Sequence, residues 1–247
     1  MKHALEDICG LVLDVDGTLT IDRKSFLLDL ELIGMLQQIA TKIPVVLVSG
    51  NAIPVMAALS RYLGFDTWPH VGENGCILYR RGQIQHICKR STRDATIVIE
   101  KELSSLLRPS GQNTFRYYDF AYIVMEGKDI EIVRRHVRKV LDAKGFDWVK
   151  LSFSGYALHL RPPEASKGIG ALKALEIVDV DPSCVVAIGD GENDIELAEA
   201  GFRMYAVANA DEKLKKVAHG VLPAPSSQGV KLFIRKLYRQ HLLDPEL

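Results

Sequence analysis

The chain has 247 residues, enough for one large domain or two small ones, and its 31 Lys and Arg residues balance 31 Asp and Glu residues. This neutrality excludes a protein that binds nucleic acid through an overall basic charge, so any anion site has to be local. No apolar run approaches the roughly 20 residues that span a membrane. The start of the chain carries Glu6 and Asp7 without a secretion-type apolar core, so we expect a cytoplasmic protein.

Four cysteines are scattered along the chain without the Cys-x-x-Cys spacing of zinc sites and redox motifs. Three of them lie in apolar runs that are typical of strands, where cysteine behaves as a small hydrophobic residue. The sequence therefore predicts small buried hydrophobic residues and no zinc site at Cys9, Cys76, Cys88 and Cys184.

Two carboxylates follow the first predicted strand. Residues 8–13 form a β-branched and aliphatic run that indicates a buried strand, and Asp14 and Asp16 come directly after it. Side chains alternate along a strand, so both carboxylates should project the same way, and Gly17 allows a turn immediately afterwards. Two adjacent carboxylates repel each other unless a cation or a shared proton lies between them, and oxygen ligands suit Mg²⁺. A solvated Asp-Gly turn is the alternative.

The next segments alternate helix and strand. Residues 26–40 have apolar side chains at helical spacing, residues 44–48 form a short buried strand, and a second helix follows. This order is typical of a parallel sheet, whose ligands bind beyond the carboxyl ends of the strands, so Asp14 and Ser49 should face one site. The Ser49 hydroxyl and the two N–H groups that follow it suit a phosphate, or an ordinary helix N-cap.

The pattern changes between residues 81 and 161. Predicted helices at 95–107 and 129–143 alternate with short antiparallel strands, which indicates an α+β insertion of about 80 residues between two halves of an α/β sheet. Its basic side chains are candidates for binding a substrate carboxylate, although each alone is more typical of a surface or packing residue. These candidates are Arg90, Arg93, Arg116, His159 and Arg161. A hydrogen-bonded core histidine is the alternative for His159, which lies in an apolar strand.

Two further patterns follow the insertion. Lys167 starts a predicted helix, where its positive charge opposes the helix dipole and does not stabilise the helix. A lysine at this position is explained instead by an interaction with anions at a functional site. Residues 184–188 form another buried strand, and the acidic loop Gly-Asp-Gly-Glu-Asn-Asp follows at residues 189–194. Carboxylates thus come again between the end of a strand and a helix.

These four patterns, in this order, resemble the motifs of the haloacid dehalogenase superfamily of phosphohydrolases. Asp14-x-Asp16-Gly17-Thr18 is similar to the first motif, Ser49 to the second, Lys167-Gly168 to the third and residues 189–194 to the fourth. The insertion is similar to the second cap type (C2) of the Cof-like branch, subfamily IIB.

The resemblance implies both the fold and the site. The fold would be α/β, with a Rossmann-like parallel-sheet core at residues 1–80 and 162–247 and an α+β cap at residues 81–161. Asp14 would be the nucleophile and Asp16 the general acid and base. The substrate phosphate would be bound by Ser49, Gly50, Asn51, Lys167 and Asn193. One Mg²⁺ would be bound by Asp14, the backbone carbonyl of Asp16, Asp190 and Asp194.

Within this branch, chain size, cap type and the compact C-terminal half are most similar to archaeal-type phosphoglycolate phosphatases. This implies Mg-dependent hydrolysis of a small phosphomonoester through an aspartyl-phosphate, with 2-phosphoglycolate giving glycolate and phosphate. The partner would be a small phosphorylated metabolite, with no nucleic acid and no membrane, and the chain would be a monomer or homodimer. Phosphatases of the same branch for sucrose phosphate or mannosyl-3-phosphoglycerate are the alternative, followed by a phosphomannomutase and by a binding module without activity.

Overall fold

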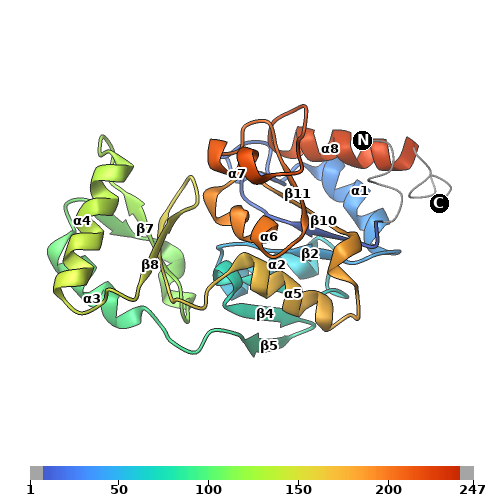
Figure 1. Cartoon of the computed structure of the whole chain (residues 1–247). Helices are drawn as coiled ribbons and strands as arrows, with labels where there is room; N and C mark the ends of the chain where they lie inside the picture. The colour runs from blue at the N-terminus through green and yellow to red at the C-terminus, as the bar shows by residue number, and fades with distance from the viewer. Residues whose placement is uncertain (1–7, 240–247) are drawn as a thin grey trace.

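The computed structural model describes residues 8–239, which form two lobes (Figure 1). The larger, core lobe contains a parallel sheet covered by helices. The smaller lobe, which we call the cap lobe, comes from the middle of the chain and contains an antiparallel sheet with two helices. This arrangement confirms the predicted α/β fold with an inserted α+β segment.

The central sheet has five parallel strands: β1 (Gly10–Leu13), β2 (Val45–Leu47), β10 (Val185–Gly189), β11 (Arg203–Ala206) and β12 (Gly220–Val221). Their order is β12-β11-β10-β1-β2, so β1 lies between β10 and β2, with Leu11 opposite both Val186 and Val45. Every residue of β1, β2 and β10 is buried, as expected for a parallel sheet with both faces covered.

A small antiparallel sheet extends the core lobe. It consists of β3 (His70–Gly72), β4 (Ile77–Arg80) and β5 (Gln83–His86), and β3 joins the central sheet through a parallel bridge between Val48 and Val71. β5 pairs with β4 along its whole length. The predicted division at residues 81 and 162 stays a proposal, and this pairing favours a cap that begins after β5.

Helices of residues 8–239 that pack on the core are α1 (Leu30–Ala40), α2 (Ile53–Tyr62), α5 (Lys167–Glu176), α6 (Ile195–Glu199), α7 (Glu212–Val217) and α8 (Ser226–Arg239). α1 begins at Leu30 and not at the predicted residue 26. Asp29 is its N-cap and accepts from the N–H of Leu32 at 3.2 Å, while Phe26 has a φ of 53°, which a helix does not allow. In this part of the chain, no helix has both the length and the apolar character needed to cross a membrane.

The cap lobe has its own hydrophobic core. Its strands are β6 (Leu107–Pro109), β7 (Phe120–Val124), β8 (Lys150–Phe153) and β9 (Leu158–Arg161), in the order β6-β7-β9-β8, and its helices are α3 (Arg93–Glu102) and α4 (Ile130–Ala143). Their apolar side chains, among them Ile99, Leu141 and Leu160, form a cluster separate from that of the core lobe. Short 3₁₀ helices complete the elements: η1 (Glu73–Gly75), η2 (Gly111–Phe115), η3 (Pro182–Cys184) and η4 (Glu192–Asp194).

The four cysteines form two disulfide bonds, which corrects the prediction that they are only small buried hydrophobic residues. Cys9 precedes β1 and Cys184 precedes β10, and the pairing of these strands places the two Cα atoms 5.4 Å apart. Cys76 and Cys88 bond across the β4–β5 hairpin, with 4.7 Å between their Cα atoms. The first bond joins residues separated by 175 positions and the second by 12, so the first restricts the unfolded chain more.

Thiol titration of the unfolded protein should find no free thiol before reduction and four afterwards. Replacing Cys9 and Cys184 with Ser should lower the free energy of unfolding by about 2–5 kcal/mol, more than the same replacement of Cys76 and Cys88. Denaturant titrations of the two double variants measure this difference. If cells are lysed in an alkylating reagent without reductant, alkylation of all four cysteines would contradict the pairing.

Candidate active site

Three carboxylates meet at the carboxyl ends of β1 and β10. Asp14 follows β1, Asp190 follows β10 and Asp194 ends η4, and one carboxylate oxygen from each lies within 4.8 Å of the others. β1 and β10 are parallel neighbours, so the residues that follow them emerge at the same edge of the sheet. All three side chains are buried, which makes their mutual repulsion strong.

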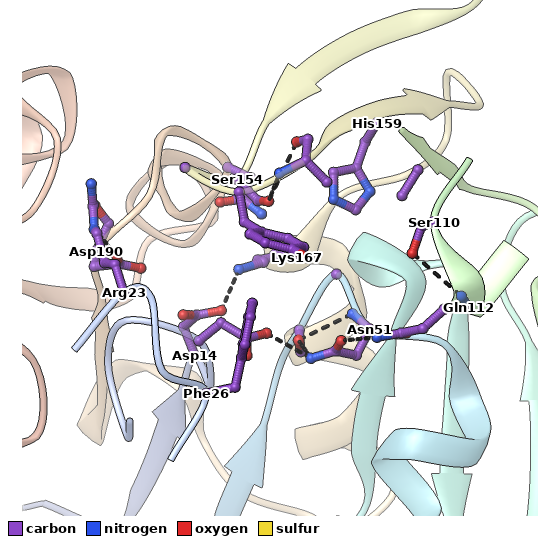
Figure 2. A pocket seen from close by; sticks show the side chains of 18 of the residues that line it. Asp14, Arg23, Phe26, Asn51, Ser110, Gln112, Ser154, His159, Lys167 and Asp190 are labelled. Carbon is purple, nitrogen blue, oxygen red and sulfur yellow. Dashed lines mark hydrogen bonds and ion pairs between the residues drawn. The ribbon is translucent and has the colours of Figure 1, made fainter. Parts of the chain in front are cut away.

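Lys167 lies among these carboxylates (Figure 2). Its ammonium donates to Asp14 Oδ1 at 2.6 Å and to Asp194 Oδ1 at 2.7 Å, and its side chain is only 1% exposed. A buried ammonium needs such partners, because an unpaired charge in the interior is very costly.

The local sequence places Lys167 at this position. Ser166 caps α5, since its Oγ accepts from the N–H of Ile169 at 3.3 Å. Gly168 allows α5 to lie close to α6, because a Cβ at that position would be 2.1 Å from the carbonyl oxygen of Glu196. The Ser-Lys-Gly sequence thus starts the helix, brings it close to its neighbour and directs the first helical side chain to the carboxylates.

Negative charge exceeds positive charge in this cluster. Burial raises the pKa of Asp14 well above its usual value, with Lys167 acting against the rise and the neighbouring carboxylates adding to it. Burial, together with the charge of Asp194, raises the pKa of Asp190 to about 7. Burial acts to lower the pKa of Lys167, but its two carboxylate partners outweigh burial and raise it, so the ammonium stays charged. Lys167 and Arg23, which pairs with Asp190, bring two positive charges against three carboxylates, so a proton or a further cation is favoured there.

Arg23 brings a second positive charge that the sequence did not predict. Its Nε donates to Asp190 Oδ2, its Nη2 donates to the Asp190 carbonyl at 2.5 Å, and its Nη1 donates to Asp211 Oδ1 at 3.1 Å. Gly17 leaves room for the Asp190 carboxylate, because a Cβ there would lie 2.2 Å from Oδ2. The only sequence signal was a basic residue shortly after Asp-x-Asp-Gly, which does not identify a partner 167 positions away.

The Asp16 carboxylate is directed to the loop after β2 and is not part of the three-carboxylate cluster. Asn51 Nδ2 donates to Asp16 Oδ2 at 2.7 Å and to Ser49 Oγ at 2.9 Å. Burial raises the pKa of Asp16, although the Asn51 hydrogen bond and the charges of Lys167 and His159 oppose the rise. The Asp16 carboxyl group and the loop residues Ser49, Gly50 and Asn51 therefore lie along one cavity.

The cap lobe contacts this loop through Gln112 (Figure 2). Gln112 Nε2 donates to Asn51 Oδ1 at 2.7 Å, and its Oε1 accepts from the N–H of Ala52 at 2.8 Å. Asn51 thus bonds at one end of its amide to the cap lobe and at the other to Asp16. The position of the Asp16 carboxylate depends in this way on the position of the cap lobe.

Asn193 takes part in a second connection between the lobes. Its Nδ2 donates to Asn74 Oδ1 at 2.9 Å, and Asn74 Nδ2 donates to Asp119 Oδ2 at 2.6 Å. The neighbouring Glu73 accepts from the N–H groups of residues 117–119 in the cap lobe. Asn193 also lines the cavity, and its predicted contact with a phosphate stays a prediction.

A cavity of about 360 Å³ lies between the two lobes. Its core side is lined by Asp14, Asp16, Arg23, Ser49, Gly50, Asn51, Lys167, Asp190 and Asn193. Its cap side includes Gln112, His159 and the β8–β9 turn. The half-exposed rings of Phe26 and Tyr156 meet edge to face, with 4.8 Å between their centroids, and also line it. These two aromatic residues come from opposite lobes, so their contact helps to enclose the cavity.

Comparisons with known proteins identify the family. A family model described as haloacid dehalogenase-like hydrolase matches residues 110–234. The chain is 38% identical to a phosphoglycolate phosphatase of Sulfolobus acidocaldarius, over 92% of this chain and 95% of that protein. It is 39% identical to the phosphoglycolate phosphatase of Metallosphaera sedula, over 92% of this chain and 97% of that protein. The chain belongs to the haloacid dehalogenase-like hydrolases.

Solved structures agree with this assignment. A Thermoplasma acidophilum protein superposes on the hydrolase with a TM-score of 0.78 at 26% identity, covering 96% of this chain and 99% of that one. The sucrose-phosphatase of Synechocystis superposes with a TM-score of 0.72 over 94% and 98% of the two chains, and at 18% identity it shows the shared fold alone. The relatives confirm the predicted enzyme class, a phosphoric monoester hydrolase.

The predicted site residues of the hydrolase lie in two adjoining groups. Asp14, Asp190, Asp194 and Lys167 form the first, and Asp16, Ser49, Gly50 and Asn51 lie together in the second. Their roles in binding and catalysis stay predictions. Arg23, Gln112 and the two aromatic residues of the cavity were not predicted from the sequence, because their positions depend on how distant segments pack.

Replacing Gln112 with Ala should lower kcat of the hydrolase about 3- to 10-fold, because Asn51 and Asp16 lose a support worth roughly one hydrogen bond. Steady-state kinetics and the melting temperature together measure the effect. Asn113→Ala is the matched control, since its amide bonds only to Ala121 inside the cap lobe and its loss should lower stability without changing kcat more than about 2-fold. Equal losses of kcat in both variants would contradict the role of Gln112.

Proposed function

We propose that this hydrolase is a Mg²⁺-dependent phosphatase that converts 2-phosphoglycolate to glycolate and phosphate through an aspartyl-phosphate. The observation that supports it most directly is the buried cluster of Asp14, Asp190 and Asp194 around Lys167, beside the Ser49 loop. The names of the Sulfolobus and Metallosphaera relatives support the substrate. A cavity of about 360 Å³ suits a small phosphorylated acid.

The residues of the cluster fit a magnesium ion. Its donors are carboxylate oxygens within 4.8 Å of one another, which is the ligand type that Mg²⁺ prefers, and the negative charge is in excess. Asp14, Asp190 and the Asp16 carbonyl would bind the ion. Asp194 would bind the ion directly or through water. Both of its oxygens accept hydrogen bonds, from Lys167 and from the N–H groups of residues 190 and 191, as both oxygens of Asp14 do from Lys167 and Thr18. The ion would neutralise charge on the phosphoryl oxygens.

Asp14 and Asp16 would divide the chemistry between them. A carboxylate oxygen of Asp14 forms a bond to phosphorus while the ester bond breaks, and the leaving oxygen takes a proton from Asp16. A water molecule then attacks the aspartyl-phosphate, gives its proton to Asp16 and releases phosphate and free Asp14. Burial raises the pKa of Asp16, which favours the protonated form that the first step requires.

Donors on the core lobe would stabilise the transferred phosphoryl group. The Ser49 hydroxyl and the Gly50 N–H come from the loop between β2 and α2, the Lys167 ammonium comes from α5, and all three residues line the same cavity. Fixed donors in an enclosed site stabilise the charge of a phosphoryl transition state without reorganising. The cap lobe covers the cavity and would exclude bulk water from the first step.

Replacing Asp14 with Asn should lower kcat on the order of 10⁴-fold or more, because an amide does not form the phosphoenzyme. The assay is phosphate release with Mg²⁺ from 2-phosphoglycolate, sugar phosphates, sucrose 6-phosphate and mannosyl-3-phosphoglycerate, and 2-phosphoglycolate should have the highest kcat/KM. Asp142→Asn, on an exposed face of α4, is the control and should keep wild-type rates. An active Asp14→Asn enzyme would overturn the assignment of Asp14 as the nucleophile. A higher kcat/KM for any other ester would overturn 2-phosphoglycolate as the substrate.

Stability should depend on both pH and Mg²⁺. Because the pKa of Asp190 rises from 3.8 to about 7 on folding, the metal-free folded state binds extra protons in this range, and the free energy of unfolding falls as pH rises from about 4 to 7. The rise in the pKa of Asp14 acts in the same direction. In EDTA, the melting temperature should therefore be lower at pH 8 than at pH 5, and the gain from added Mg²⁺ should be larger at pH 8.

Thermal melts at the two pH values, each with EDTA and with Mg²⁺, test this dependence. Asp190→Asn is the matched variant, because it removes the titrating group. It should reduce both the fall in melting temperature from pH 5 to pH 8 in EDTA and the rise in melting temperature on adding Mg²⁺. A stabilisation by Mg²⁺ that is equal at pH 5 and pH 8 would show that these carboxylates do not bind the ion.

A further inference from the structure

Most basic side chains of the cap lobe that the sequence offered for binding a carboxylate already have partners. The guanidinium of Arg90 lies over the Trp148 ring at 3.4 Å from its centroid, and that of Arg161 pairs with Glu196 at 2.8 Å. The guanidinium of Arg93 lies over the Phe120 ring at 4.9 Å. These three cations pack or neutralise within the protein and do not line the cavity between the lobes.

Arg116 lines the cavity but is directed to the backbone. Its Nη1 donates to the carbonyl of Asp119 at 3.0 Å, and its Nη2 donates to the carbonyl of Gly50 at 2.8 Å. The side chain is 3% exposed, and its two hydrogen bonds join the cap lobe to residues 49–51, which we call the phosphate loop because we propose that they bind the phosphate. Each terminal nitrogen holds a backbone carbonyl with one of its N–H groups, which fixes the guanidinium between the lobes.

His159 is the remaining candidate, and its ring has one nitrogen in use and one free. Nδ1 lies 3.0 Å from both carboxylate oxygens of Asp119, whereas Nε2 makes no hydrogen bond within residues 8–239. Asp119 is fully buried, and although burial acts to raise its pKa, the charges and hydrogen bonds of His159 and its other partners lower it. The Asp119 carboxylate accepts from Nδ1–H and so orients the ring, and a second ring proton would lie on Nε2.

The ring reaches the cavity directly beside the phosphate loop (Figure 2). A Cβ built on Gly50 would lie 3.2 Å from Cε1 of His159, the ring atom between the two nitrogens. Gly50 is also the residue whose N–H we place on the phosphate. A group that meets Nε2 would therefore lie only a short distance from the phosphoryl site.

We propose that His159, with protons on both ring nitrogens, donates its Nε2–H to the carboxylate of a short phosphorylated acid and selects such substrates over phosphomonoesters without a carboxylate. Asp119 and Asn74 position the ring, and Asn193 supports Asn74 from the fourth motif. Because the ring lies close to Gly50, the substrate would have only a short chain between its carboxylate and the ester oxygen. This inference rests on the proposed phosphatase function and assigns its substrate class to one side chain.

The test compares 2-phosphoglycolate with ethyl phosphate, which has a similar length and no carboxylate. His159→Asn places an amide nitrogen near the position of Nδ1, so it keeps a donor for Asp119 and lacks the group that enters the cavity. Its kcat/KM for 2-phosphoglycolate should fall about 10- to 100-fold, the effect of losing a hydrogen bond to a charged group, mainly through KM. Its kcat/KM for ethyl phosphate and the inhibition constant of inorganic phosphate should change less than about 3-fold.

Two further variants complete the design. Arg90→Gln removes a cap cation that packs on Trp148 and should leave the preference between the two substrates unchanged. His159→Gln carries a neutral donor near the position of Nε2 and should show a smaller loss in the same direction. It replaces the Asn variant as the deciding measurement if circular dichroism shows that the Asn variant does not fold.

The outcomes separate this inference from the proposed function. Equal losses for both substrates, or a preference for 2-phosphoglycolate that survives the loss of Nε2, would overturn the role of His159 and leave the phosphatase function intact. A wild-type enzyme with the same kcat/KM for ethyl phosphate and for 2-phosphoglycolate would overturn both the proposed substrate and this inference. A wild-type enzyme that hydrolyses neither ester would overturn the proposed function itself.

Discussion

One buried ammonium shared by two carboxylates is the constraint on which the site depends. Lys167 donates to both Asp14 and Asp194, and neither the lysine nor its partners would be tolerated in the interior alone. The sheet brings the carboxylates from two neighbouring strands, and α5 brings the lysine at its first turn, where its charge opposes the helix dipole. The parallel strands and the start of α5 thus bring these charges together, and the three carboxylates still outnumber the positive charges of Lys167 and Arg23.

The cap lobe contributes position more than charge. Gln112, Arg116 and Asp119 all bond across the boundary between the lobes, to Asn51, the Gly50 carbonyl and Asn74 respectively. Each of these core groups lies in or next to the loop after β2 or the turn after β3. A shift of the cap lobe would change all three contacts together, so the geometry of the loop after β2 depends on the position of the cap lobe.

The features that the sequence predicted are those encoded by local patterns. An apolar run followed by carboxylates identifies a strand end, and parallel neighbours bring such ends together, so Asp14 and Asp190 were predictable as a pair. Gln112 and Arg23 resemble ordinary polar loop residues, since their partners are distant in the sequence and depend on packing. The disulfide pairs left a usable signal: Cys9 and Cys184 each directly precede a strand, and the predicted adjacency of those strands would have matched them.

The bond between Cys9 and Cys184 has a consequence for the far end of the same strands. It joins β1 and β10 where they begin, while Asp14 and Asp190 repel each other where these strands finish. The disulfide bond keeps the two strands together at the end where they begin, so the repulsion between the carboxylates cannot separate the strands along their whole length. The spacing between these two aspartates is then restricted by the covalent link at the other end of the strands, and the ion of the proposed function would have to match that spacing.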